Sequence, residues 1–355
     1  MNKIMYLLNY VGDGGSEKYV LDLIQSMDPE CCILVYSTPG PFLHRFEALN
    51  IPIYQIEMKH PFDIKTAWKL KEIIAKEQVD IVHAQFLREN YIAILAKLLG
   101  ASIRVIWTYH VDVPMSLPLK WCNNIFTRYN DTIICISQFM KQQLLQKGVR
   151  KDKLKIIYNG LEDPYLNNLP SVHKPMKIAV IGRLSEEKGQ PFLVHGLQKL
   201  KTKYPSLQWH CNIIGDGPLK TQLEDLVTSL QLNDSVSLLG FRDDIIKEYS
   251  AHDIIVIPSK NEGLSYVAIE AIAMKKPVIA TNIGGLPEVI VPNQSGISIP
   301  YGDVEQLATA LATLLQDDKL YYSLAECGRE YYLQHFTFSK MIEEVKHIYR
   351  IPSSC

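Results

Sequence analysis

Closely spaced cysteine pairs of the Cys-x-x-Cys type and long apolar runs are both missing from this sequence. Its 355 residues include seven cysteines, an odd number, and no two of them stand in a Cys-x-x-Cys spacing. That pattern argues against a disulfide framework and a zinc site, and it favours a reducing, cytoplasmic environment. The longest apolar run, Tyr91–Leu99, contains Lys97 and is far shorter than the roughly 20 residues that a membrane-spanning helix needs. The first apolar run leads into a glycine-rich turn, so we expect a strand there rather than a signal peptide.

A surplus of either charge is absent as well. The 37 Lys and Arg residues are balanced by 38 Asp and Glu residues, which argues against a nucleic-acid partner and against an acidic tail. The charges are unevenly spread, because residues 1–160 hold 19 basic side chains against 15 acidic ones. Part of this excess is the group Lys141, Lys147, Arg150, Lys151 and Lys153. These side chains either contact the inner face of an anionic membrane or belong to an ordinary solvated helix and loop, and the sequence leaves both open.

Two domains are expected from the length and from the order of the sequence patterns. Short β-rich runs alternate with amphipathic segments, which is typical of parallel sheets covered by helices. The alternation breaks over 159–175, a stretch rich in Pro, Gly and Asn that indicates a linker. The predicted strands are 3–10, 31–36, 51–56, 81–84, 103–109, 132–136 and 155–158 before this break, and 176–181, 209–214, 235–239, 254–257, 277–280 and 296–299 after it. We therefore predict two doubly wound α/β domains in tandem, whose ligands bind beyond the carboxyl ends of the strands.

The first predicted strand runs into Gly12-Asp13-Gly14-Gly15-Ser16-Glu17, before a helix expected over 17–27. Glycines at such a point let the backbone turn tightly into a helix whose first N–H groups attract an anion. Gly14 and Gly15 are therefore candidates for binding a phosphate or an acceptor hydroxyl. A plain strand-to-helix turn explains the same residues equally well.

A second loop, Gly182-Arg183-Leu184-Ser185-Glu186-Glu187-Lys188-Gly189, follows the first strand of the second series. Two cations just beyond a strand end suit a diphosphate, whose charge has to be neutralised. Alternatively, the loop is solvated, and the two glutamates pair with Arg183 and Lys188.

The third and most informative loop joins the strand predicted at 254–257 to a helix that we expect to begin near Ser265 or Tyr266. The amides of Leu264, Ser265 and Tyr266 then lie at a positive helix end, which favours an anion. Glu262 lies in the loop, and Glu270 lies one turn inside the helix among apolar neighbours. A carboxylate in such surroundings needs a partner, either a backbone amide or a lysine, or the diol of a ligand.

These residues resemble the signature of a known enzyme family. Glu262 and Glu270, separated by seven intervening residues, come after Pro258-Ser259 and before 277–281 and Gly284-Gly285, and this arrangement resembles retaining family 4 glycosyltransferases of the GT-B fold. The segments 182–189, Gly215-Asp216-Gly217-Pro218 and Tyr158-Asn159-Gly160 resemble further landmarks of that family in the expected order. The resemblance spans both domains and is densest over 176–300. It implies two Rossmann-like domains and an enzyme of the kind that builds bacterial cell-surface polysaccharides and glycolipids.

The resemblance also implies a role for each domain and for each motif. Residues 1–165 form the acceptor side, to which a helix at about 338–355 returns, and residues 173–337 bind a nucleoside-diphosphate sugar, UDP- or GDP-linked, without a metal or other cofactor. In the second domain, the resemblance implies that Arg183 and Lys188, with Gly182 beside them, bind the diphosphate and that Glu270 binds the ribose. Glu262 and the amides of Gly263, Leu264, Ser265 and Tyr266 would surround the sugar and phosphate. In the first domain, Gly14 and Gly15 would contact the phosphate or the acceptor, and His110 would face the donor sugar.

This sequence departs from the family pattern at several positions. Ser265 and Tyr266 stand where many relatives have Gly or Pro, and Gln85, two residues after His83, stands where a second histidine is common. These departures leave the identity of the donor sugar open. Outside the resemblance, His110 is an isolated histidine after a strand, a position more often filled by a packed or solvated residue.

The expected reaction is transfer of a hexose-type sugar, with retention, to a hydroxyl of a glycan, a lipid-linked acceptor or a small molecule. Asp-x-Asp occurs nowhere in the chain, which agrees with a donor site that uses no metal ion. No carboxylate pair suited to a double-displacement mechanism is visible either. Two alternatives remain: a sugar-nucleotide epimerase of similar fold, which needs no acceptor, and a non-catalytic protein that binds nucleotide-sugars without turnover.

Overall fold

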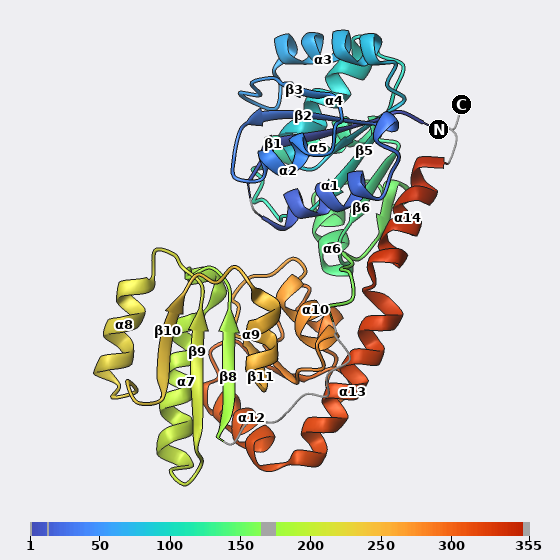
Figure 1. Cartoon of the computed structure of the whole chain (residues 1–355). Coiled ribbons are helices and arrows are strands. Elements are labelled where there is room, and N and C mark those ends of the chain that lie inside the picture. Colours follow the sequence, from blue (N-terminus) through green and yellow to red (C-terminus); the bar gives the residue numbers. More distant parts are fainter. Residues whose placement is uncertain (1, 13, 165–174, 351–355) are drawn as a thin grey trace. The chain divides into compact units, whose positions relative to one another are not determined.

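The computed structural model describes residues 2–12, 14–164 and 175–350, which divide into two compact units (Figure 1). One unit comprises Met1–Asn159 and Ser339–Cys355, and the other comprises Gly160–Phe338, as far as these ranges are described. Most of the linker expected at 159–175 lies outside the described residues. Among the helices that are described, none is both long enough and apolar enough to cross a bilayer.

The first unit is built on a parallel sheet of seven strands in the order β3-β2-β1-β4-β5-β6-β7, with helices on both faces (Figure 1). The strands are β1 (Ile4–Tyr10), β2 (Cys32–Thr38), β3 (Ile53–Gln55), β4 (Ile81–Ala84), β5 (Arg104–Tyr109), β6 (Thr132–Cys135) and β7 (Leu154–Ile156). The helices are α1 (Gly15–Gln25), α2 (Leu43–Glu47), α3 (Ile64–Glu77), α4 (Leu87–Leu98), α5 (Leu117–Phe126), α6 (Gln138–Gln146) and α14 (Phe338–Arg350). Each predicted strand of the first series overlaps one of these strands.

Unbroken apolar runs form the central strands because both faces of the sheet are covered. On β1, the five residues from Ile4 to Leu8 are all buried. Met5 and Leu7 belong to an apolar cluster that also contains Leu70 of α3 and Ile92 of α4. Burying each such side chain contributes roughly 1.5–3 kcal/mol, so these two helices hold one face of the sheet firmly.

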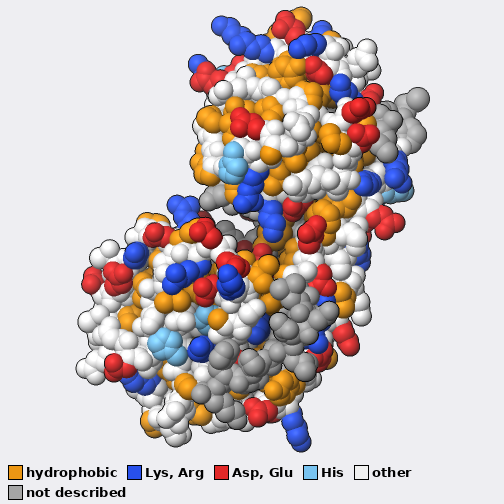
Figure 2. Space-filling model, in the orientation of Figure 1, with side chains coloured by type: hydrophobic (Ala, Val, Ile, Leu, Met, Phe, Trp, Pro, Cys, Tyr) orange, Lys and Arg blue, Asp and Glu red, His pale blue; other side chains and the backbone are white. Residues whose placement is uncertain are grey.

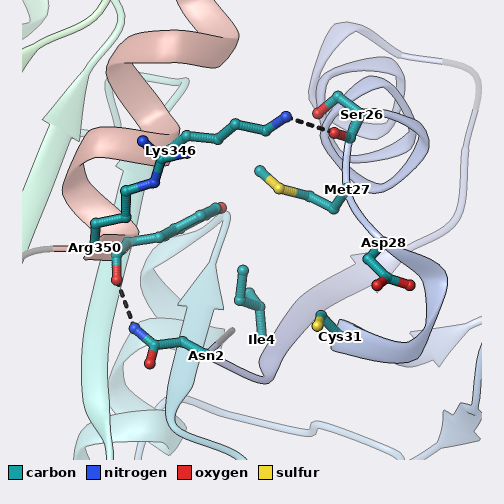
Figure 3. A pocket seen from close by; sticks show the side chains of 9 residues that line it. Asn2, Ile4, Ser26, Met27, Asp28, Cys31, Lys346 and Arg350 are labelled. Atoms are coloured by element: carbon teal, nitrogen blue, oxygen red, sulfur yellow. Dashed lines mark hydrogen bonds between the residues drawn. The ribbon is translucent and has the colours of Figure 1, made fainter.

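Helix α14 covers the other face of this sheet. Its apolar residues at helical spacing, Met341, Ile342, Val345, Ile348 and Tyr349, are buried. The guanidinium of Arg104 donates to the carbonyl oxygens of Tyr349 and Ile348 at 3.0 and 2.9 Å, which satisfies groups that the end of a helix leaves open. Two further links run from Lys346 Nζ to the Ser26 carbonyl (Figure 3) and from Asn2 Nδ2 to the Tyr349 carbonyl, both 2.7 Å. The helix is thus fixed by polar bonds as well as by its apolar stripe.

His83 of β4 lies on this face as a fully buried core residue. Its Nδ1 is 2.7 Å from the Tyr349 hydroxyl, and its Nε2 is 2.7 Å from Thr108 Oγ1. Both ring nitrogens therefore have partners within the unit, and the ring holds strand and helix together.

We expect the first unit to lose stability as the pH falls below about 6.5, because folded His83 resists protonation. Burial, helped by the neighbouring His110, lowers the pKa of His83 to about 3 from an ordinary value of 6.5. Between these pKa values the unfolded chain binds a proton that the folded unit does not. This contribution to stability is complete above pH 6.5 and is lost toward pH 3, at about 1.4 kcal/mol per pH unit. Urea unfolding at pH 7, 6, 5 and 4 measures it.

The matching variant is His83→Gln, which keeps a polar side chain but cannot take up the proton. Its free energy of unfolding should depend on pH less steeply, by about 1.4 kcal/mol per pH unit between pH 6 and 4. The exposed His195→Gln controls for loss of a histidine elsewhere. Equal slopes for the wild type and His83→Gln would refute this account of acid sensitivity.

The second unit has a parallel sheet of six strands in the order β10-β9-β8-β11-β12-β13 (Figure 1). The strands are β8 (Met176–Ile181), β9 (Trp209–Ile214), β10 (Val236–Gly240), β11 (Ile254–Ile257), β12 (Val278–Thr281) and β13 (Ile297–Ile299). The helices are α7 (Gln190–Lys203), α8 (Lys220–Ser229), α9 (Ile245–Ala251), α10 (Tyr266–Ala273), α11 (Leu286–Val289), α12 (Val304–Gln316) and α13 (Asp318–His335). The prediction of two doubly wound α/β sheets is confirmed.

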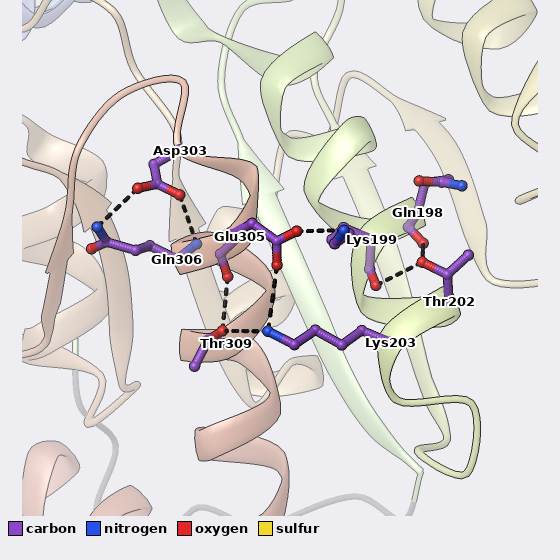
Figure 4. A network of polar contacts seen from close by, with 8 residues as sticks. All are labelled: Gln198, Lys199, Thr202, Lys203, Asp303, Glu305, Gln306 and Thr309. Atoms are coloured by element: carbon purple, nitrogen blue, oxygen red, sulfur yellow. Dashed lines mark hydrogen bonds and ion pairs between the residues drawn. The ribbon is translucent and has the colours of Figure 1, made fainter.

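Helices α7 and α12 pack against each other closely because of a glycine. A Cβ on Gly196 would lie 2.3 Å from Leu307 Cδ2, so a larger residue would force the Leu307 side chain to move. Beside this contact, Lys199 and Lys203 of α7 lie around Glu305 of α12 in an exposed polar network (Figure 4). Exposed ion pairs contribute little, so the apolar contact is the one that holds the two helices together.

Candidate functional site

Three loops meet at the carboxyl edge of the second sheet, where parallel α/β folds bind their ligands. They follow β8, β11 and β12. Gly189, at φ +67°, would place a Cβ 2.0 Å from the Pro258 carbonyl oxygen, and Gly284, at φ +60°, would place one 1.9 Å from the Glu262 carbonyl oxygen. The loops touch at these points only because no side chain intervenes.

An ion pair joins the first two loops. Lys188 Nζ lies 2.8 Å from Glu262 Oε2, and the Glu262 side chain is only 10% exposed. Arg183 is exposed, and among the described residues we find no carboxylate paired with it. The alternative expected from the sequence, in which Glu186 and Glu187 pair with Arg183 and Lys188, is wrong for Lys188.

Backbone hydrogen bonds hold Glu262 in place. The Gly285 amide donates to the Glu262 carbonyl at 3.0 Å, and the Lys260 amide donates to the Glu187 carbonyl at 2.8 Å. The carboxylate therefore belongs to a loop that is tied on one side to the loop after β12 and on the other to the loop after β8. This fixes Glu262 beside Lys188.

Helix α10 begins at Tyr266, as predicted, with Ser265 as its N-cap. Ser265 Oγ accepts from the Ala268 amide at 3.3 Å. Gly263 and Leu264 lead into this cap, and Leu264 is buried. The first turn of a helix leaves backbone N–H groups that attract negative charge, so this helix end adds positive potential close to Glu262 and Lys188.

Glu270, one turn further along α10, accepts a hydrogen bond from Tyr249 of α9. The hydroxyl lies 2.8 Å from Glu270 Oε2. Burial, and then the charge of Glu270, raises the pKa of the tyrosine well above its ordinary value. Sequence reasoning missed Tyr249, because nothing in the local pattern relates it to a residue 21 positions later.

Glycines also bring the loops after β8 and β9 together beside Arg183. A Cβ on Gly215 would lie 2.0 Å from the Gly182 carbonyl oxygen, and one on Gly217 would lie 2.4 Å from the Leu184 carbonyl oxygen. The Leu184 amide donates to the Asp216 carbonyl oxygen at 2.9 Å. These backbone contacts support the loop that carries Arg183.

The candidate residues of the first domain lie at the carboxyl edge of the first sheet. Gly14 is the N-cap of α1 and Gly15 is its first residue, so the helix begins earlier than the expected 17–27. His110 follows β5; its Nε2 is 2.9 Å from Gln85 Oε1, and its ring meets the edge of Tyr19 at 5.1 Å. Burial lowers the pKa of His110 to about 3, so the imidazole is neutral at physiological pH.

A cavity of about 470 Å³ opens beside His110 within the first unit. Its lining includes Gln85 and two residues that sequence reasoning missed, Glu89 and Trp107. Glu89 is fully buried in the first turn of α4. The sequence offers no signal for this, since a glutamate in the first helical turn is normally solvated.

The basic group considered for membrane contact is only partly available. Lys147 is buried, pairs with Asp112, and donates to the Tyr109 hydroxyl at 3.0 Å and to the Val113 carbonyl at 2.7 Å. The prediction that Lys147 belongs to a surface patch is therefore wrong. On the face shown in Figure 2, Lys and Arg lie among Asp and Glu rather than in a single patch.

Two family models match the chain in succession. The one described as Glycosyltransferase Family 4 matches residues 13–163, and the one described as Glycosyl transferases group 1 matches residues 163–331. An uncharacterized glycosyltransferase of Methanocaldococcus jannaschii is 26% identical over 362 aligned positions, which cover 98% of this chain and 98% of that protein. These matches run through both units and through all of the loops described above.

Two further proteins are similar over nearly the full length. A Campylobacter jejuni enzyme named N-acetylgalactosamine-N,N'-diacetylbacillosaminyl-diphospho-undecaprenol 4-alpha-N-acetylgalactosaminyltransferase is 26% identical, covering 90% of this chain and 92% of that one. Anabaena HepE in complex with UDP superposes with a TM-score of 0.87 at 20% identity, covering 98% and 99%. HepE also forms a complex with UDP-glucose. The chain belongs to the family 4 glycosyltransferases of the GT-B fold.

Proposed function

We propose that this glycosyltransferase moves a hexose-type sugar, with retention, from a UDP- or GDP-linked donor to a hydroxyl of a glycan, lipid-linked or small-molecule acceptor. The observation that carries the proposal is the group at the carboxyl edge of the second sheet. There Lys188, Glu262 and the N-terminus of α10 lie together. Fixed positive charge beside a carboxylate suits a substrate with an anionic diphosphate at one end and hydroxyl groups at the other.

In the proposed reaction the bond between the anomeric carbon and the phosphate oxygen breaks, and the diphosphate takes the electron pair. Arg183, Lys188 and the amides of α10 stabilise the charge that accumulates there, so the site needs no metal ion. The acceptor oxygen bonds to the anomeric carbon from the same face, and its proton passes to the leaving phosphate. Glu262 accepts hydroxyl hydrogen bonds from the sugar, and Glu270 accepts them from the ribose.

The relatives favour particular substrates for this chain. HepE is named in complexes with UDP and UDP-glucose, and the C. jejuni relative is named for a diphospho-undecaprenol acceptor. We therefore propose UDP as the first donor base to test and a lipid-linked glycan as the first acceptor class. Gly14 and Gly15, at the start of α1, and His110 are the proposed contributions of the first domain. The scattered cysteines, which show no disulfide or Cys-x-x-Cys pattern, support action in the reducing cytoplasm, with any membrane contact peripheral.

Thermal unfolding with added nucleotides tests the donor site. UDP or GDP at 100 times its Kd should raise the stability of the unit that binds it by about 2.7 kcal/mol, with or without EDTA. Glu270→Gln should weaken this effect, because an amide replaces a carboxylate acceptor. Glu224→Gln, on exposed α8, is the matched control. No shift with UDP, GDP, ADP or CMP would contradict the proposal.

The turnover assay and the product separate the remaining alternatives. Binding without turnover would support a nucleotide-sugar-binding protein, and conversion of the donor without an acceptor to an isomer would support an epimerase. A product whose anomeric configuration is inverted, as seen by NMR, would contradict retention.

A further inference from the structure

The cavity in the first unit is placed where an α/β sheet accepts a ligand. It lies at the carboxyl ends of three neighbouring strands: Asn9 and Tyr10 end β1, residues 85–89 follow β4, and Trp107, Tyr109 and His110 lie at or after the end of β5. Its volume of about 470 Å³ is within the range of pockets that bind small molecules.

Glu89 gives this cavity an unsatisfied acceptor. The side chain is fully buried, and neither carboxylate oxygen has a hydrogen-bond partner on another described residue. Burial raises the pKa of Glu89 to about 7. A buried carboxyl group without a partner costs several kcal/mol when it ionises, and the apolar residues around it gain nothing from its charge. This cost points to a ligand group that donates hydrogen bonds to it.

Trp107 adds an unsatisfied donor to the same cavity. Its ring is almost fully buried, and Nε1 has no partner within the part of the chain that the structure describes. Buried indole N–H groups are normally bonded. A hydroxyl group both donates and accepts, so a molecule with several hydroxyls matches a carboxylate and an indole N–H together.

Among the described residues, the lining carries no surplus of positive charge that would attract an anionic ligand. Glu17 and Glu89 both line the cavity, and Nη1 of Arg88 donates to Asn9 Oδ1 and to the Met58 carbonyl, each at 2.9 Å. The one guanidinium of the lining is thus held by the protein's own oxygens. Most of the remaining lining is apolar or aromatic, with Tyr10, Phe86, Tyr109, Val111, Val113 and Met115. Such a surface suits the C–H face of a sugar ring.

We propose that this cavity is an acceptor subsite for a neutral sugar ring, whose hydroxyls donate to Glu89 and accept from Trp107 Nε1. The inference rests on the proposed function, because it makes the cavity the place where the sugar acceptor is recognised. It also predicts weaker binding of a phosphate or carboxylate group, which would meet two glutamates against one arginine, Arg88, whose Nη1 is already bonded to protein oxygens.

Saturation-transfer NMR on the full chain tests the subsite without any turnover. The neutral probes are the methyl α-glycosides of glucose, galactose and N-acetylglucosamine, and the anionic probes are glucuronate and L-malate. We expect saturation transfer to at least one neutral glycoside and not to the anions. Glu89→Gln and Trp107→Phe should each weaken glycoside binding at least fivefold, since the first replaces an acceptor oxygen by an amide donor and the second removes the indole N–H. Glu72→Gln, exposed on α3, is the matched control.

Each outcome bears on the subsite separately from the donor site. Glycoside binding that is absent, or equal in the wild type, Glu89→Gln and Trp107→Phe, overturns the inference, and so does stronger binding of the anions. UDP titration of the same wild-type sample reports on the proposed function. If UDP stabilises the protein while no glycoside binds, only the proposed subsite is contradicted. If UDP does not stabilise the protein while glycoside binding depends on Glu89, the subsite is supported and the proposed function is contradicted. Thermal midpoints of the two variants show whether they are folded.

Discussion

Lys188→Ala should lower kcat/KM for the nucleotide-sugar donor by about two to three orders of magnitude. The substitution removes a fixed cation from the place where we propose that the leaving diphosphate gathers charge. It also leaves Glu262, which is only 10% exposed, without the lysine that lies 2.8 Å away. An uncompensated carboxylate beside an anionic leaving group raises the barrier further. Steady-state kinetics with the donor that the nucleotide titration identifies measures the effect.

Lys220→Ala provides the matched control for Lys188→Ala. Lys220 is an exposed residue at the start of α8, and its loss changes the net charge of the same unit by the same amount. The control should retain kcat/KM within about twofold, as expected for a solvated surface charge. A loss of less than tenfold in Lys188→Ala, in protein that unfolds at the wild-type temperature, would show that this lysine does not stabilise the transition state.

Gly284→Ala should destabilise the second unit by about 2–4 kcal/mol, within the range of severe single substitutions. Two costs combine. A residue other than glycine is strained at φ +60°, and the new Cβ would lie 1.9 Å from the Glu262 carbonyl oxygen. Because the new Cβ would meet a backbone atom, which cannot rotate away as a side chain can, the loop that carries Glu262 has to move. Activity should therefore fall together with stability. Urea unfolding followed by circular dichroism measures the loss of stability.

Gly302→Ala separates the two costs. Gly302 also has a positive φ, +87°, but a Cβ there would have nothing within 4 Å. It should show only the conformational cost, about 1 kcal/mol, and should keep its activity. Equal destabilisation by the two alanines would mean that the contact between Gly284 and Glu262 does not constrain the loop.

The features of the fold that depend on local chemistry could be predicted from the sequence. The amphipathic pattern of residues 64–77 predicts a helix, and α3 has these bounds, because the stripe follows Asp63, whose side chain accepts from the Thr66 amide. The start of α10 was predictable for the same reason, because Ser265 is a good N-cap. Helix α1 begins two residues before the expected Glu17, because glycines carry no side-chain signal that marks the first turn.

Contacts between distant residues could not be predicted in this way. Lys188 and Glu262 are 74 positions apart, and the nearer glutamates beside Lys188 made a local pairing the natural alternative. Lys147 stands in a run of basic residues that is typical of a solvated surface, yet it is buried. There it pairs with Asp112 and donates a hydrogen bond to the Tyr109 hydroxyl. Burial of this kind depends on which loops the fold brings together, and hydrophobic periodicity carries no information about it.

Helix α14 makes the first unit discontinuous in the chain, because Gly160–Phe338 is inserted before Ser339. During synthesis the seven strands of that unit leave the ribosome early, whereas the helix that covers one of their faces is made only after the whole second unit. Until then, the guanidinium of Arg104 lacks the two carbonyl groups that it binds in the finished protein. The second unit forms from one continuous stretch and can fold as it is made. The amino-terminal unit, although begun first, is therefore completed last.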